Sequence, residues 1–280
     1  MSNLPFWTKP SELVLWAELI SIWTLGNYWL APDTQRTNGA SAFGPGSAWR
    51  TAGAAVLVAA LAALLPAPTT SALPRVVLAV LLGSLTLVGV GGRNRLVRSA
   101  RGKRWLTEWE LSLVCALVAS TAIVICKSSV PATQPGDLLR SGRAAALLTF
   151  LAAICFAFRG GTYIVRGVLD KVGAKPTVRR TPEAKKEEGV EPRPLDLPEL
   201  NRGRTIGHLE RLLMVMVIGL GSYQALAFLI AAKGLIRAKE FEDRDFAEYF
   251  ILGSLTSAAV ALPLGVLVQV TLPLLWSLPP

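Results

Sequence analysis

The chain has 280 residues, of which 52% are hydrophobic and only 17% are charged, and its mean hydropathy is +0.45. Soluble globular proteins usually carry about 25% charged residues, so this composition argues against a soluble enzyme and predicts an integral membrane protein. Lysine and arginine total 29 against 19 acidic residues, which gives a net charge of +10. In a soluble protein such an excess favours nucleic-acid binding. In a membrane protein it results from basic cytoplasmic loops, so we expect no nucleic-acid partner.

Seven stretches are apolar enough to cross a bilayer, because a hydrocarbon core about 30 Å thick needs about 20 helical residues and tolerates about 17. In chain order they are Leu13–Ala31, Thr51–Pro66, Arg75–Val90, Trp109–Cys126, Ala144–Phe158, Leu212–Ala232 and Tyr249–Trp276. Glu18 and Asn27 interrupt the first stretch, so an interfacial helix is the alternative there. The sequence predicts an all-α, polytopic transmembrane helix bundle of about seven spans.

The positions of the basic residues test this count. Six lie between the third and fourth spans: Arg93, Arg95, Arg98, Arg101, Lys103 and Arg104. Twelve more lie between residues 159 and 211, and two spans separate the groups, so both share one side. With Arg36 and Arg50, that side holds 20 of the 29 basic residues. The positive-inside rule makes it the cytoplasm. Seven spans then predict an N-terminus outside and a C-terminus in the cytoplasm.

The predicted spans divide the chain into three parts. Residues 1–171 form a five-span transmembrane body, residues 172–200 a mobile cytosolic linker, and residues 201–280 a two-span C-terminal hairpin. The linker is rich in proline and charge between Lys175 and Leu200, so it cannot bury enough apolar surface to offset its ordering entropy. A cytosolic protein partner would bind through this segment.

The basic cluster between residues 93 and 104 has no interleaved aromatic residue until Trp105. This pattern favours a solvated positive-inside loop over nucleic-acid binding. Juxtamembrane basic clusters of this kind bind anionic lipid headgroups. We therefore expect the lipid bilayer, including its anionic headgroups, to be the partner of this cluster.

Catalytic and metal-binding patterns are missing from the sequence. The cysteines lack metal-ligand spacing, and His208 is the only histidine, so a multi-histidine metal site is excluded. The glycines between residues 89 and 92 lack the G-x-G-x-x-G spacing of a dinucleotide site. We expect a protein that is not an enzyme and that holds no cofactor or metal.

Ionisable residues inside membrane spans are costly and mark function by default. Glu18 is the clearest case. As a functional residue it faces the bundle and acts as a proton or cation relay or as a substrate contact. The alternative is a shallow position near the interface, or a pair with a basic residue of another span. Tyr223 and Gln224 lie at mid-depth of the sixth span. They either form hydrogen bonds between packed helices or line a permeation path. Pro263 should kink the last span, and Gln269 follows nearly two turns later.

The segment after residue 200 carries the most specific motifs. It reads N-R-G-R-T-I-G-H-L-E-R over residues 201–211, A-A-K over 231–233 and A-E-Y-F-I-L-G-S-L-T-S over 247–257. This pattern resembles the C-terminal signature of an uncharacterised family of bacterial polytopic membrane proteins, across Asn201–Val268. The resemblance implies a shared membrane module and a multi-pass protein of the bacterial plasma (inner) membrane, and no established activity comes with it.

Charged residues bracket the two spans of this module. Glu210 and Arg211 open the first span, while Lys233 and Glu248 stand at the connector between the spans. We expect these four residues to lock the hairpin against the five-span body. Arg244 is placed four residues before Glu248, as in a short interfacial helix.

Two classes of function follow from these observations. A membrane scaffold or regulatory component is favoured because no catalytic set can be assembled and the cytosolic side is basic. The alternative is a transporter or channel for a small solute or ion that uses Glu18 and the polar residues within the spans.

Overall fold

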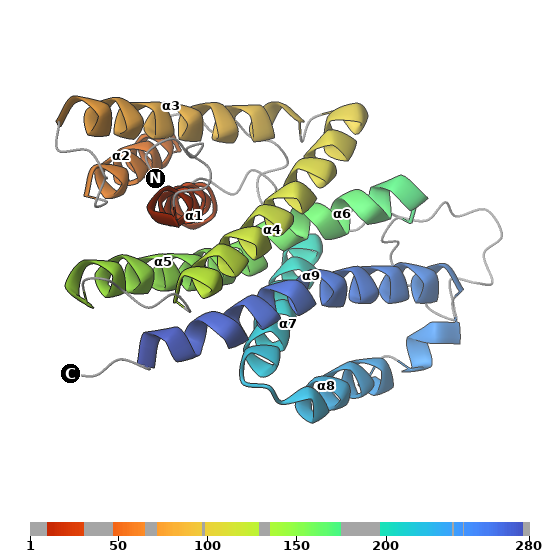
Figure 1. Cartoon of the computed structure of the whole chain (residues 1–280). Coiled ribbons are helices and arrows are strands. Elements are labelled where there is room, and N and C mark those ends of the chain that lie inside the picture. The colour runs from red at the N-terminus through yellow and green to blue at the C-terminus, as the bar shows by residue number, and fades with distance from the viewer. Residues whose placement is uncertain are drawn as a thin grey trace.

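The computed structural model describes residues 10–30, 47–64, 72–96, 99–128, 135–174, 197–236, 238–242 and 244–276. Within these ranges the protein is helical and contains no strand (Figure 1). The elements are α1 (Pro10–Leu25), η2 (Gly26–Leu30), α2 (Ala48–Leu64), α3 (Ala72–Leu96), α4 (Ala100–Ser128), α5 (Pro135–Cys155), η3 (Phe156–Gly160), α6 (Gly161–Val172), α7 (Leu197–Gly219), α8 (Tyr223–Ile236), η5 (Ala238–Glu242) and α9 (Arg244–Trp276). The expectation of an all-α protein is confirmed.

Three stretches of helix are long and apolar enough to cross a membrane. They are Val76–Leu96, Ala145–Val172 and Phe246–Pro273, with 21, 28 and 28 residues. A helix rises about 1.5 Å per residue, so each one can reach across a hydrocarbon core about 30 Å thick. The helices α2 and α8 are apolar but shorter. The described residues therefore form a helical protein of membrane type.

Large apolar side chains are exposed along entire helices. On α3, Val77, Leu81 and Val88 are all exposed. The whole of α8 is described, and none of its residues is buried. Soluble monomers rarely expose contiguous apolar patches larger than a few hundred Å². Contact with lipid accounts for these faces.

Hydroxyl groups buried in the helices bond to their own backbone. The Thr86 hydroxyl donates to the Leu82 carbonyl at 2.9 Å. The Thr271 hydroxyl donates to the Leu267 carbonyl, also at 2.9 Å. These bonds to the carbonyl four residues earlier satisfy a polar group without water. That solution suits a helix in hydrocarbon, where an unpaired hydroxyl is costly.

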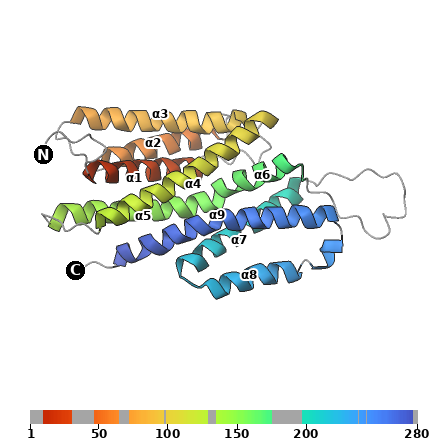
Figure 2. The same cartoon turned by 45° about the vertical axis from the view of Figure 1, so that its right-hand side comes forward.

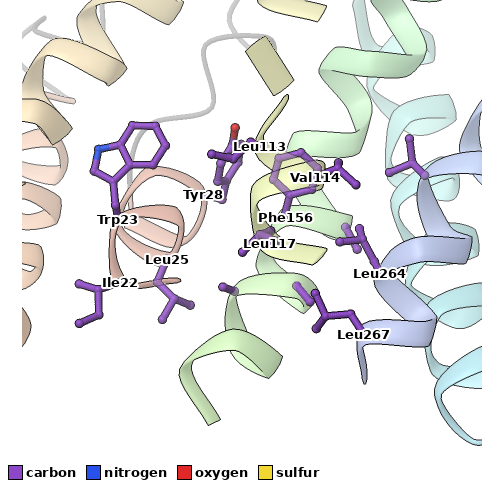
Figure 3. Close-up of a cluster of buried hydrophobic side chains, with 14 of the residues drawn as sticks. Ile22, Trp23, Leu25, Tyr28, Leu113, Val114, Leu117, Phe156, Leu264 and Leu267 are labelled. Carbon is purple, nitrogen blue, oxygen red and sulfur yellow. The ribbon is translucent and has the colours of Figure 1, made fainter. Parts of the chain in front are cut away.

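The main apolar core lies between α1, α4, the α5–η3 segment and α9 (Figure 3). Its most enclosed side chains come from all four, and Ile22, Leu117, Phe156 and Leu264 are each less than 2% exposed. Because these residues are far apart in the sequence, their packing fixes the four elements relative to one another.

The segment predicted as the sixth span, Leu212–Ala232, is two helices instead of one. The helix α7 ends at Gly219, α8 begins at Tyr223, and the chain turns back between them (Figure 1). With 14 residues, α8 is about 21 Å long, which is shorter than a hydrocarbon core. The prediction of one continuous helix across this segment was therefore wrong.

The reversal depends on Gly221, whose φ is 71°. Glycine reaches this left-handed conformation without a steric cost, whereas other residues rarely adopt it. The Gly221 N–H donates to the Ile218 carbonyl at 2.8 Å, and the Ser222 N–H donates to the Val217 carbonyl at 3.0 Å. This pair of bonds is the Schellman pattern that ends a helix.

Contacts distinguish the two ends of the bundle. At one end, Leu275 of α9 packs against Val14 of α1 and Ala145 of α5. At the other end, Gly253 near the start of α9 lies beside Leu169 of α6. The helix α9 therefore runs from the end of the bundle where α6 ends to the end where α1 begins (Figure 2).

Candidate functional site

Two π-helical turns meet inside the bundle. The turn η2 continues α1, and η3 joins α5 to α6. Tyr28 of η2 and Phe156 of η3 are both buried, and their ring centroids lie 5.0 Å apart in an edge-to-face arrangement (Figure 3). Single π-helical turns inside helices are uncommon and occur frequently at functional sites. Their meeting point therefore marks the candidate site.

A buried group of charged and aromatic side chains, here called the Arg93 cluster, adjoins this point. It consists of Tyr28, Arg93, Glu110 and Tyr163. Arg93 donates from Nε to Glu110 Oε1 at 3.1 Å and from Nη2 to the Tyr28 hydroxyl oxygen at 2.9 Å. The Tyr28 hydroxyl in turn donates to the Glu110 carboxylate. The guanidinium carbon lies 5.4 Å from the centre of the Tyr163 ring. The cluster thus links η2, α3, α4 and α6.

The burial of Arg93 separates it from the basic cluster to which the sequence analysis assigned it. Arg93 is 6% exposed, and its partner Glu110 is fully buried. Arg95, Arg101 and Arg104 are exposed. Arg98 lies outside the described residues, as does the Lys103 side chain. The helix α3 continues past Val90, the predicted end of its span, to Leu96, so Arg93 is part of the helix and not of a loop. Arg93 therefore holds the helices together and does not face lipid headgroups.

A second buried group, the Arg211 cluster, lies on the other side of η3. It consists of Thr162, His208, Arg211 and Ser257 together with the backbone carbonyl of Ala157. Arg211 donates from Nε to Ser257 Oγ at 3.2 Å and from Nη1 to the Ala157 carbonyl at 2.9 Å. Nη1 also lies 3.4 Å from Thr162 Oγ1. His208 Nε2 and Thr162 Oγ1 are 2.7 Å apart. The cluster ties α7 to η3, α6 and α9.

The turn η3 stands between the two clusters. Phe156 contacts Tyr28 on one side, and the carbonyl of the next residue, Ala157, accepts from Arg211 on the other. Gly161 leaves room for this contact, since a Cβ at that position would lie 2.7 Å from Arg211 Nη1. Movement of η3 would therefore disturb both clusters together.

Glu18 is buried in α1 and is 1% exposed. Its Oε1 atom has no hydrogen-bond partner among the described residues. One turn further along, the hydroxyls of Ser21 and Thr149 lie 3.1 Å apart at the contact of α1 with α5. A buried carboxyl group without a fixed partner is one that a proton or cation can neutralise.

Glu210 and Lys233 form a salt bridge between α7 and α8, with Nζ and Oε2 2.5 Å apart. The sequence analysis placed them at opposite ends of one span. They meet because the chain reverses at Gly221. This pair closes the α7–α8 hairpin, while Arg211 joins the hairpin to the rest of the bundle.

The remaining predicted residues lie on α8 and α9. The Tyr223 hydroxyl donates to Gln269 Oε1 at 3.1 Å, so Tyr223 and not Gln224 makes this contact with α9. Gln224 is exposed. Glu248 accepts from Arg244 Nε at 2.9 Å on the exposed surface, as their spacing predicts.

Sequence reasoning missed several members of the two clusters. Tyr28 and Glu110 were not singled out, although Glu110 is an acidic residue just inside a predicted span and so carried the same signal as Glu18. His208 was considered only as a lone histidine that excludes a multi-histidine metal site. Thr162 had no distinguishing pattern, since hydroxyl residues are common in membrane helices. Ser257 ends the motif over residues 247–257 but was not singled out within it.

Among the described residues, no group of three or more His, Cys, Asp or Glu side chains is placed to hold a metal ion. Comparison with protein-family models, curated proteins and solved structures gives no match to this chain. The two clusters and Glu18 are therefore the features of the described residues that bear on function.

Proposed function

We propose that the protein is a transporter for a small solute or ion in a bacterial plasma membrane. The observation that carries this proposal is the meeting of two π-helical turns between two buried arginine clusters. Buried ionisable groups inside membrane bundles are rare and mark ion or substrate pathways. Transporters commonly build their binding sites where membrane helices are interrupted. Here η2 and η3 are the interruptions.

Movement through such a site requires an element with two arrangements. The turn η3 supports this role because its neighbouring residues Phe156 and Ala157 contact different clusters. A shift of η3 would weaken the contact of Phe156 with Tyr28 and the hydrogen bond from Arg211 together. Glu18 would supply the titratable group that couples a proton or cation to the movement.

For the arrangement in the membrane, we propose six crossings and one hairpin that turns back, in place of seven spans. The crossings are α1–η2, α2, α3, α4, α5–η3–α6 and α9, and the hairpin is α7–α8. The start of α1 and the end of α9 then face the outside. The seven-span prediction of a cytoplasmic C-terminus required the segment now split into α7 and α8 to cross the membrane.

The transport proposal is tested with purified protein in proteoliposomes that contain a pH-sensitive dye. Gradients of amino acids, organic acids, sugars and inorganic ions are applied in turn. We expect one class to drive a dye response that Glu18→Gln reduces about tenfold or more, since the substitution removes the buried carboxyl group of the α1 crossing. Glu108→Gln, at an exposed position of α4, is the matched control. No response above that of protein-free vesicles for any solute would contradict the proposal.

A scaffold or regulatory component is the second candidate, and the exposed Arg95, Arg101 and Arg104 favour it. Such arginines suit anionic headgroups or an acidic partner. The Lys175–Leu200 linker, most of which lies outside the described residues, would hold a cytosolic protein. Retention of every co-purifying protein after deletion of this linker would argue against the scaffold. We also propose that Asn201–Val268 is the shared membrane module that its motifs suggest.

A further inference from the structure

The helix α7 presents three basic side chains on one face. Arg204, His208 and Arg211 are spaced by four and three residues and so lie along one side of the helix. This side faces η3 and α6, where His208 and Arg211 are buried and are 7% and 3% exposed. Arg204 is half-buried, so this face carries two guanidinium groups and an imidazole.

The hydrogen bonds of Arg211 leave part of its guanidinium group for another partner. A guanidinium has five N–H donors. Nε uses its donor on Ser257, and Nη1 directs its two toward Ala157 and Thr162. Among the described residues, no acceptor contacts the two donors of Nη2.

The acceptors that Arg211 does have are all neutral. Two are hydroxyls and one is a backbone carbonyl. The neighbouring carboxylate, Glu210, is engaged by Lys233 at 2.5 Å. Within the described part of the chain, no carboxylate forms an ion pair with Arg211. Glu210 acts electrostatically on Arg211 but forms no ion pair with it. A buried cation without a paired counter-charge is expensive, and an anion that binds beside it lowers that cost.

We propose that the Arg211 cluster is a binding site for a small oxyanion, a carboxylate or a phosphate. The two N–H donors that remain, both on Nη2, can donate to the oxygen atoms of such a group in a charge-assisted hydrogen bond. His208 and the hydroxyls of Thr162 and Ser257 complete the polar lining. This inference names the substrate class of the proposed transporter and so rests on that proposal.

The depth of the cluster indicates a free solute as the ligand. Ser257 lies 11 residues inside the apolar stretch Phe246–Pro273, about 16 Å from its nearer end. Lipid phosphates lie outside the hydrocarbon core. A soluble anion that enters the bundle can reach Arg211, whereas a headgroup must leave its own layer to do so.

The test measures binding to the detergent-purified, delipidated full chain by titration calorimetry and thermal unfolding. Sodium phosphate and sodium acetate are the probes, in sodium chloride of matched ionic strength, and phosphatidylglycerol in mixed micelles is the lipid arm. We expect at least one free oxyanion to bind and to raise the melting temperature. Arg211→Lys keeps the charge but loses the planar fork, and should weaken binding about tenfold or more.

Ser257→Ala is a milder variant that guards against misfolding, and it should weaken binding by a smaller factor. The exposed Arg202→Lys on α7 is the matched control and should leave binding unchanged. The site assignment is overturned if neither free anion binds, if only the lipid binds, or if both cluster variants bind like the wild type. Binding without flux would reject the transporter and keep the site. Flux that is unchanged in Arg211→Lys would keep the transporter and reject Arg211 as its substrate site.

Discussion

At the scale of single residues, the Arg93 and Glu110 side chains show how a charged pair is held inside an apolar bundle. The carboxylate receives one hydrogen bond from Arg93 and one from the Tyr28 hydroxyl, and the guanidinium also contacts an aromatic face. Enclosed charges are tolerated only when their hydrogen-bonding groups are satisfied in this way. Removal of one partner would leave the other as an uncompensated charge.

Arg93→Ala is therefore expected to destabilise the protein by about 3–5 kcal/mol, the range found when a buried pair is broken. The double variant Arg93→Met with Glu110→Leu should cost clearly less, because no charge is left alone. Unfolding in detergent, followed by circular dichroism, measures both. Arg244→Ala breaks an exposed pair and should change stability by only about 0.2–0.5 kcal/mol. Equal losses in the free energy of unfolding for the single and double variants would show that the pair is not coupled.

These residues also mark where sequence reasoning stops. Glu18 was singled out from the sequence because an acidic residue inside an apolar stretch is visible without a structure. Arg93 was not separated from its basic neighbours, because its sequence context is the same as theirs. Its distinguishing property is contact with Glu110 and Tyr28, which come from elements that only tertiary packing brings together.

At the scale of elements, the α7–α8 hairpin depends on one backbone conformation. Hydropathy alone favours a single helix across this segment, because nearly every residue in it is apolar. Gly221 permits the left-handed conformation that ends α7, and Tyr223 then fixes the start of α8 against Gln269. A glycine within an apolar run is common in membrane helices, so its sequence could not reveal the turn.

Gly221→Ala is expected to destabilise the protein by about 1–2 kcal/mol, the cost of a left-handed conformation for a residue with a Cβ atom. Gly221→Asn should cost less, since asparagine tolerates this region. The matched control is Gly53→Ala in α2, where a Cβ would meet nothing within 4 Å. That control should be neutral or stabilising by about 0.5–1 kcal/mol. If both alanine variants melt like the wild type, the turn is not where the chain reverses.

Other helices extend beyond the ends of the predicted spans. The helix α4 begins at Ala100, well before the predicted Trp109, because arginine and lysine are good helix formers. The α5–α6 helix extends beyond Phe158 for the same reason. Hydropathy locates the part of a helix that lies in lipid, whereas the helix itself continues into the polar layer.

At the scale of the whole molecule, the hairpin changes how charge is distributed across the membrane. The connector between Lys233 and Glu248 carries four basic residues. Since α8 returns to the end of the bundle where α6 ends, these residues join the 20 already assigned to the cytoplasmic side. Only Lys9, Arg75, Lys127, Arg140 and Arg143 are then left outside. The positive-inside asymmetry is stronger in this arrangement than in the seven-span one.

The central claim, that α7 and α8 turn back within the membrane so that Arg211 enters the bundle, is tested most directly by cysteine labelling. Single cysteines replace Gln134, Gly189, Glu242 and Leu278 in a cysteine-free background, and intact cells are treated with an impermeant maleimide. Positions 134 and 278 should be labelled from outside, and positions 189 and 242 only after permeabilisation. Labelling of 242 from outside together with protection of 278 would restore the seven-span arrangement and contradict the account.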